Sequence, residues 1–251
     1  ISFFKGFLGA GLKDNSSVFK GVLTGILRIS RESIFTDLNN LGVYSVLDSE
    51  YSSYFGFTED EVITILKTYN CFDKIDDVRT WYDGYLFGNK RIYNPWSILR
   101  FTSSIDKSFK PFWANTSSNE ILRDLIKNAP AGVKESLRDL LKDIPVQTRL
   151  NKNVVFRDLE KDELTIYSFL TFSGYLKAYD KEHKENKDYY KLLIPNLEVK
   201  QIFEDIIEKW ISESFENHKL KIMLEGLVSG DTDLFEEILG DFIIDTLSYF
   251  D

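Results

Sequence analysis

The stretch WYDGYLFGNKRIYNPWSILRF, Trp81 to Phe101, constrains the fold of this 251-residue chain more than any other segment. It holds seven aromatic residues in twenty-one positions, together with Gly84, Gly88 and Pro95. Aromatic residues need a core to pack in, whereas glycine and proline interrupt a continuous helix. The stretch therefore predicts either a ligand-gripping site or a well-packed corner between two helices.

Short helices with clear start signals are expected on both sides of this stretch. Thr58 and Glu61 have the spacing of a capping box, and Ser117 and Glu120 repeat it. Apolar residues follow each pair at helical spacing, and a further amphipathic helix is predicted over 132–141. The aromatic stretch thus lies among several well-capped helices.

The second half of the chain predicts a helix, a hairpin and another helix. The first helix covers 162–174, and two strands follow that are joined by the polar run Lys181–Lys187. Asn196 then caps a long helix, which completes the outline of a winged-helix-like unit. Acidic residues nearly balance the lysines of the hairpin, so a solvated hairpin is favoured over a wing that touches DNA. Two more helices follow, separated at Gly230–Asp231.

The segment VFKGVLTGILRISRESIF, near the start of the chain, offers a second candidate site. Val22–Leu23 running into Thr24–Gly25 predicts a short buried strand that ends in a small polar pair. Ligands of open α/β sheets bind beyond the carboxyl ends of the strands, so Thr24 is placed to touch one. Arg28 and Arg31 follow, and they either face a ligand phosphate or lie solvated at a strand end.

The composition suits a folded chain without disulfides or membrane spans. Hydrophobic residues make up 43% and charged residues 28%, which is ordinary for a globular protein. No run approaches eighteen consecutive apolar residues, so no membrane contact is expected. Cys71 is the only cysteine, which excludes an internal disulfide and suits the cytoplasm, where we expect the protein. The net charge of −9 argues against a general electrostatic attraction to nucleic acid.

The sequence contains no complete active site. His183 and His218 are the only histidines, and both lie among charged neighbours, so neither a zinc site nor a Ser-His-acid triad is indicated. The G-x-x-x-x-G-K-[ST] loop, an acidic Walker B strand and an Asp…Glu-x-Lys nuclease arrangement are all absent. We therefore expect no metal site, no complete set of catalytic residues and no activity from this chain alone.

Seven segments follow one another along the chain: LTGILRISRESIFTDLNNL, YFGFTEDEV, WYDGYLFGNKRIYNPWSIL, FWANTSSNEIL, FSGYLKAYD, IPNLEVKQIF and LSYFD. Together they resemble the AAA-ATPase-like proteins that are common in gut and anaerobic bacteria. In that family a P-loop ATPase module precedes a PD-(D/E)XK nuclease domain. The resemblance runs from about Ser2 to Asp251, and the long aromatic motif is its most specific part.

The resemblance implies a mainly α fold of the α+β class. Residues 1–40 would be a remnant of the P-loop α/β core, 41–143 a multi-helix lid, 144–215 a winged-helix-like unit with a small β-hairpin, and 216–251 a helical connector toward a nuclease domain. In the family the Walker motifs precede this region and the nuclease core follows it. The chain is thus expected to be the middle of a longer protein, in keeping with isoleucine at position 1.

The resemblance also implies roles for individual residues. Thr24–Gly25 matches the TG strand end of the family and would sense the terminal phosphate. Arg28, in the TGILRI pattern, would face that phosphate as an arginine finger does, and Arg31 is a further nucleotide-sensing candidate. In related signalling-type ATPases a proline-containing turn of the lid contacts adenine, and Asn94–Pro95 is its counterpart by analogy. Pro95 fixes φ and presents a flat apolar face.

Two function hypotheses remain open. In the first, the lid and winged-helix-like unit sense nucleotide and couple ATP binding and hydrolysis to an attached nuclease. ATP and Mg²⁺ would then serve the full-length protein, with neither held tightly by this chain, and the partners would be the N-terminal ATPase portion and the C-terminal nuclease domain. Nucleic acid would be reached through that longer protein. In the second, the chain is a non-catalytic scaffold that binds a protein or nucleic-acid partner.

Overall fold

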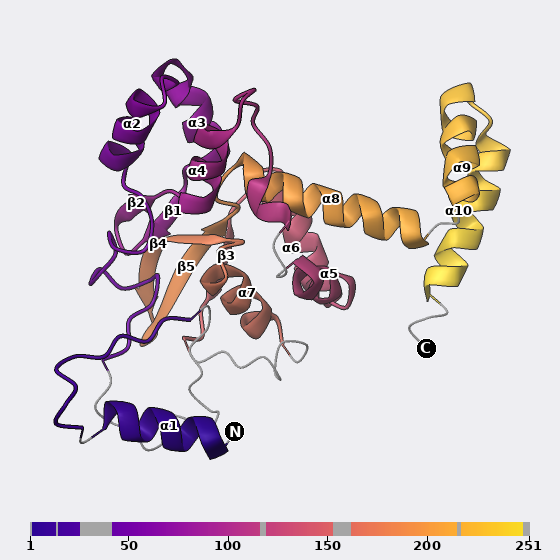
Figure 1. Ribbon diagram of the computed structural model, residues 1–251. Coiled ribbons are helices and arrows are strands. Elements are labelled where there is room, and N and C mark those ends of the chain that lie inside the picture. Colours follow the sequence, from indigo (N-terminus) through magenta and orange to yellow (C-terminus); the bar gives the residue numbers. More distant parts are fainter. Residues whose placement is uncertain are drawn as a thin grey trace. The chain divides into compact units, whose positions relative to one another are not determined.

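A computed structural model of the chain describes residues 2–13, 15–25, 42–115, 119–152, 162–214 and 217–247 (Figure 1). Over these residues the chain is mainly helical, with ten α-helices and two small antiparallel sheets. This confirms the α+β class expected from the sequence. The chain divides into two compact units, Ile1–Ile202 and Phe203–Asp251. The division into ATPase remnant, lid, winged-helix-like unit and connector stays a prediction.

The aromatic stretch is split among several elements, as its glycines and proline predict. The α-helices are α1 (Ser2–Leu12), α2 (Glu59–Thr68), α3 (Ile75–Tyr82), α4 (Pro95–Ser103), α5 (Asn119–Lys127), α6 (Ala131–Leu141), α7 (Glu163–Phe172), α8 (Leu197–Ser214), α9 (Asn217–Ser229) and α10 (Thr232–Leu247). The strands are β1 (Tyr85–Phe87), β2 (Lys90–Ile92), β3 (Val146–Arg149), β4 (Lys177–Lys184) and β5 (Lys187–Leu193), and two 3₁₀ turns are η1 (Phe72–Lys74) and η2 (Phe112–Asn115). The stretch therefore covers the end of α3, the β1–β2 hairpin and most of α4.

The buried strand predicted at Val22–Leu23 is wrong. Residues 20–25 have no regular secondary structure, and Val22 and Leu23 are 71% and 47% exposed. A strand needs a neighbour for its backbone N–H and C=O groups. None of the residues that the structure describes pairs with this segment, so its local apolar pattern does not suffice to make a strand.

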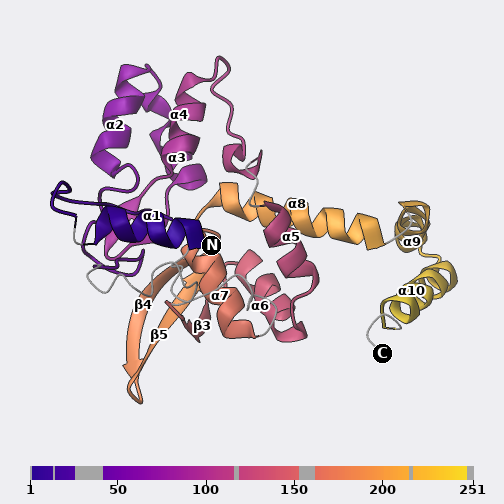
Figure 2. The ribbon, with the colours of Figure 1, turned by 60° about the horizontal axis from the view of Figure 1, so that its bottom comes forward.

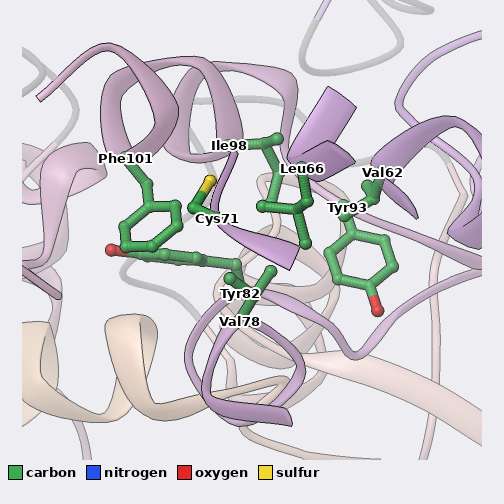
Figure 3. Packing of buried hydrophobic residues seen from close by; sticks show 8 residues of the cluster. All are labelled: Val62, Leu66, Cys71, Val78, Tyr82, Tyr93, Ile98 and Phe101. Carbon is green, nitrogen blue, oxygen red and sulfur yellow. The ribbon is translucent and has the colours of Figure 1, made fainter. Parts of the chain in front are cut away.

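The aromatic stretch contributes to a core between α2, α3 and α4 (Figure 3). Tyr82, Tyr93 and Phe101 are completely buried in it, and Figure 3 shows Phe101 against Tyr82 and Val62 beside Tyr93. The ring centroids of Tyr82 and Phe101 are 6.1 Å apart. Burying a large apolar side chain stabilises a fold by roughly 1.5–3 kcal/mol, so these rings hold the three helices together. The predicted packed corner is confirmed.

Side chains at the predicted caps begin several helices. The Thr58 backbone N–H donates to the Glu61 carboxylate (2.8 Å), which confirms the capping box of α2. Asn196 accepts from the Val199 backbone N–H (3.0 Å) at the start of α8. The cap proposed at Ser117 lies outside the described residues.

The β1–β2 hairpin depends on two glycines. Gly84, before β1, has φ +114°, and Gly88, in the turn, has φ +55°. Both angles favour glycine, since a Cβ atom clashes with the backbone there. A Cβ atom at Gly84 would also lie 2.0 Å from the carbonyl oxygen of Pro195. Gly84 thus allows the start of the hairpin to meet the segment between β5 and α8.

The β4–β5 hairpin belongs to a three-stranded antiparallel sheet in the order β3-β5-β4 (Figure 2). Its strands run further into the polar Lys181–Lys187 segment than predicted, because the turn needs only Glu185 and Asn186. Both turn residues have positive φ, +49° and +59°, which is typical of a two-residue type I′ turn. The sequence analysis missed β3, whose residues V-Q-T-R carry no strong strand pattern.

The second unit contains the paired helices α9 and α10. Gly230, with φ +76°, separates them, and the Asp231 carboxylate accepts from the Leu234 backbone N–H (3.2 Å) to cap α10. The predicted break at Gly230–Asp231 is therefore confirmed. Among the residues that the structure describes, no helix is long and apolar enough to cross a membrane.

Replacing Gly84 by alanine is expected to destabilise the first unit by about 3 kcal/mol or more, because the new Cβ combines a strained φ with overlap on Pro195. Urea unfolding followed by circular dichroism measures the effect. Gly9→Ala in α1 is the matched control, since a Cβ there meets no atom within 4 Å, and its free energy of unfolding should change by less than about 1 kcal/mol. Equal unfolding curves for the two variants would contradict the assigned role of Gly84.

Candidate functional site

The first unit contains a cavity of about 200 Å³ between the β1–β2 hairpin and the corner where α7 leads into β4. Its lining comes from positions 46, 55, 85–87, 92–95, 113, 171–174 and 176–178. Most of these side chains are apolar or aromatic, with a few polar groups among them. A concave, largely apolar site with few polar groups is the usual form of a small-molecule site.

Asn94 and Pro95 form one corner of this cavity, at the first turn of α4. The Asn94 side chain accepts a hydrogen bond from the Trp96 backbone N–H (3.0 Å) and so caps the helix. Pro95 occupies the first helical position, where a backbone N–H would have no partner within the helix, so the missing N–H of proline costs no hydrogen bond. The structure therefore places both adenine candidates at a cavity, while adenine contact itself stays a prediction.

Tyr93 lines the cavity next to this corner and is held from two sides. Its backbone exchanges two hydrogen bonds with Phe57, at 2.8 and 3.1 Å. Its hydroxyl donates to the Glu59 carboxylate, which also accepts from the Arg79 guanidinium (Nε–Oε1, 2.9 Å). Burial raises the pKa of Tyr93, and the bond to Glu59 adds to that rise. The Tyr93 hydroxyl is thus engaged in a structural hydrogen bond between α2 and the segment that leads into α4.

Gly174 and Trp113 shape the opposite wall of the cavity. Gly174 has φ +87°, and a Cβ on it would lie 3.4 Å from the Tyr85 ring and 3.5 Å from the Trp113 ring. Trp113 in turn packs on Tyr175, with ring centroids 4.8 Å apart. These contacts close one side of the cavity with flat aromatic surfaces.

A buried carboxylate, that of Glu198, holds Trp113 in position. Glu198 is 0% exposed. It accepts hydrogen bonds from the Ser97 hydroxyl of α4 (2.7 Å) and the Trp113 backbone N–H of η2 (2.9 Å). Burial raises the pKa of Glu198 to about 7, although the bonds from Ser97, Trp113 and Phe112 act in the opposite direction. Glu198 lies in the first turn of α8, so one ionisable group joins α4, η2 and α8.

Among the nucleotide-sensing candidates, the described residues Thr24 and Gly25 do not line this cavity. Thr24 and Gly25 are exposed in a segment without regular structure. Arg28 and Arg31 lie outside the described residues, so their nucleotide-sensing role stays a prediction. His183 is exposed, with its Nδ1 2.8 Å from the Asp188 carboxylate. Within the described part of the chain, no group of three or more His, Cys, Asp or Glu side chains is arranged to hold a metal ion.

Sequence reasoning missed Trp113, Gly174 and Lys177, which form the other side of the cavity, and Glu198, which bonds to the Trp113 backbone. Glu198 follows the cap Asn196, where a carboxylate is common because the helix dipole favours it. Gly174 stands where a helix is expected to end, which is also common. Neither signal indicates burial or a cavity, since both arise from local helix geometry.

No protein-family model matches this chain, and no solved structure matches it. The chain is 27% identical over 198 residues to a protein of Azotobacter chroococcum mcd 1 described as "Uncharacterized protein in vnfD 5'region". The match covers 76% of this chain and 36% of that relative. The chain thus has a distant bacterial homologue that is much longer than the matched region. The resemblance to AAA-ATPase-like proteins stays a prediction.

The raised pKa of Glu198 gives a stability that falls as the pH rises. Between its ordinary pKa of 4.5 and about 7, the folded chain binds a proton that the unfolded chain has released. The free energy of unfolding therefore decreases across this window. At 1.36 kcal/mol per pKa unit, the decrease amounts to about 3 kcal/mol.

Glu198→Gln is expected to remove this dependence, because glutamine does not titrate. Urea unfolding at several pH values from 5 to 8 measures the effect, as the difference in slope between the variant and the wild type. Glu204→Gln, an exposed position on the same helix, is the control and should follow the wild type. Parallel slopes for Glu198→Gln and the wild type would show that Glu198 does not titrate in this window.

Proposed function

We propose that this chain is the nucleotide-responsive lid and winged-helix-like part of a longer ATPase-type switch, and that its cavity receives the adenine ring. The main support for the proposal is that Asn94 and Pro95 lie in the cavity lining. Chosen from the sequence as the adenine corner, they line a cavity whose other side includes the distant segment 171–178.

The size and lining of the cavity suit one planar ring system. A cavity of about 150 Å³ lined by apolar side chains accepts benzene, and the cavity here is about 200 Å³. Pro95 offers a flat apolar face, and Trp113 offers an aromatic one. Offset stacking between rings is worth roughly 0.5–1.5 kcal/mol beyond the burial of area. Adenine combines a flat ring with polar edges, which matches apolar walls that carry a few polar groups.

The two-sided lining supports a switch rather than a passive site. One side comes from the β1–β2 hairpin and the start of α4, and the other from the end of α7 and the start of β4. A ligand that contacts both sides stabilises the arrangement in which they lie together. It shifts an equilibrium only as far as it prefers that arrangement. Glu198 would couple ligand binding to the position of α8, because it bonds to Trp113 in the cavity wall and lies on α8.

The residues that hydrolyse ATP would belong to other parts of the longer protein. ATP hydrolysis requires a phosphate loop and magnesium ligands, which the sequence of this chain lacks. The homologue is much longer than the matched region, which is consistent with additional modules in such proteins. We extend the proposal to an attached nuclease on the resemblance alone.

A non-catalytic scaffold is the second candidate, and one observation favours it. Tyr44, Tyr51 and Tyr54 contact one another through their rings, at 4.9 and 6.2 Å between centroids, and are 51%, 48% and 78% exposed. Exposed tyrosines that gather in one place are common in protein interfaces. An ordered chain that binds no adenosine would favour this candidate over the lid.

The cavity is expected to bind adenosine, and Pro95→Ala is expected to weaken that binding about tenfold. Alanine keeps the first turn of α4 but removes the flat face of the ring, and a tenfold loss corresponds to about 1.4 kcal/mol. Tryptophan fluorescence during an adenosine titration measures the affinity, because Trp113 lines the cavity.

Pro130→Ala is the matched control, since Pro130 precedes α6 and does not line the cavity. Ala178→Leu is a second test, because it adds bulk to a cavity-lining position and should abolish adenosine binding. Binding that survives both Pro95→Ala and Ala178→Leu unchanged would place adenosine elsewhere and refute the proposed site.

In the longer protein, Arg28→Ala is expected to lower ATP turnover by about a thousandfold, the lower end of the effect of arginine fingers. Steady-state phosphate release measures this. Arg138→Ala is the control, because Arg138 is an exposed residue of α6 whose ion pair is with Glu135 of the same helix. Undiminished turnover by the Arg28 variant would exclude the phosphate-facing role of Arg28.

A further inference from the structure

Lys177, at the start of β4, is a half-buried cation that lines the cavity. In the described part of the chain, no hydrogen bond or ion pair to its ammonium group is formed. Burial lowers the pKa of Lys177, which reflects the cost of holding a positive charge away from water. A charge that is partly removed from water and has no partner is unfavourable, so its presence beside a cavity needs an explanation.

The two carboxylates that act on Lys177 electrostatically, Asp83 and Asp143, are paired elsewhere. Asp83 lies 3.3 Å from the Arg91 guanidinium and accepts the Gly84 backbone N–H at 2.6 Å. Asp143 lies 2.8 Å from the Lys200 ammonium. The ion-pair partners of both carboxylates are thus other cations, Arg91 and Lys200. Within the described part of the chain neither carboxylate forms an ion pair with Lys177, which lines the cavity.

We propose that Lys177 receives the anionic group of the ligand, so that the cavity selects a nucleotide over the uncharged nucleoside. This inference rests on the proposed function, since it assigns the other end of the ligand whose ring meets Pro95. A phosphate oxygen accepts a charge-assisted hydrogen bond from the ammonium, which is stronger than a neutral one. Bound phosphate would supply the partner that neither Asp83 nor Asp143 provides.

A purely structural role for Lys177 makes a different prediction. In that case its methylene stem covers apolar surface while the ammonium reaches toward water. Removal of the charge would then leave the affinity for a phosphorylated ligand unchanged. The two roles are separated by the ratio of two affinities, which a general loss of packing does not alter.

The test is calorimetric titration of the full chain with AMP and with adenosine. The wild type is expected to bind AMP about tenfold more tightly than adenosine, as one charge-assisted hydrogen bond allows. Lys177→Gln should lose this preference and bind the two compounds with equal affinity, and Lys177→Arg should keep most of the preference. Lys181→Gln is the matched control on the same strand, because Lys181 is exposed and paired with Asp188 at 2.7 Å.

The outcomes separate this inference from the proposed function. Adenosine binding without any preference for AMP in the wild type would overturn the role of Lys177 and leave the adenine cavity intact. A Lys177→Gln variant that still prefers AMP to adenosine as strongly as the wild type would also overturn the role of Lys177. Failure of the wild type to bind either compound would overturn the adenine cavity itself, and the inference with it. Added salt should weaken the AMP preference but leave adenosine binding unaffected.

Discussion

The burial of Tyr82, Tyr93 and Phe101 is the constraint on which the cavity region depends. These rings fill the space between α2, α3 and α4, and the cavity begins where that packing ends. Tyr93 contributes to both, since it is buried in the core and lines the cavity. Its backbone bonds to Phe57 and its hydroxyl bond to Glu59 fix it from independent directions. The corner at Asn94–Pro95 follows directly in the chain and takes its position from this anchor.

Two ionisable side chains give the cavity region its electrostatic character. Glu198 lies behind the wall and is satisfied by hydrogen bonds from Ser97 and Trp113. Lys177 lies in the lining, and among the described residues it has electrostatic neighbours but no bonded partner. Glu198 holds a wall in position, whereas Lys177 is the group that we propose for the anionic end of a ligand. Apolar walls strengthen both effects, because charges interact more strongly where water is excluded.

Much of the fold followed from local patterns. The capping box at Thr58 and Glu61, the break at Gly230–Asp231 and the split aromatic stretch were all predicted, because each depends on neighbouring residues alone. The strand at Val22–Leu23 was predicted wrongly and β3 was missed, since strands depend on partners that are distant in sequence. The apolar segment Val22–Leu23 pairs with no other segment among the described residues, whereas β3 pairs with β5 despite its polar residues.

The candidate site also combines features that local sequence determines with features that depend on distant segments. The sequence by itself determined that Asn94–Pro95 starts a helix and presents a flat apolar corner, since capping and proline geometry are local. Only the tertiary structure decided that Gly174, Lys177 and Trp113 complete a cavity with that corner, and that Glu198 is buried behind it. Burial and the pairing of charges are set by segments far apart in the chain. The fold brings Arg91 to Asp83 and Lys200 to Asp143, and among the described residues neither carboxylate pairs with Lys177.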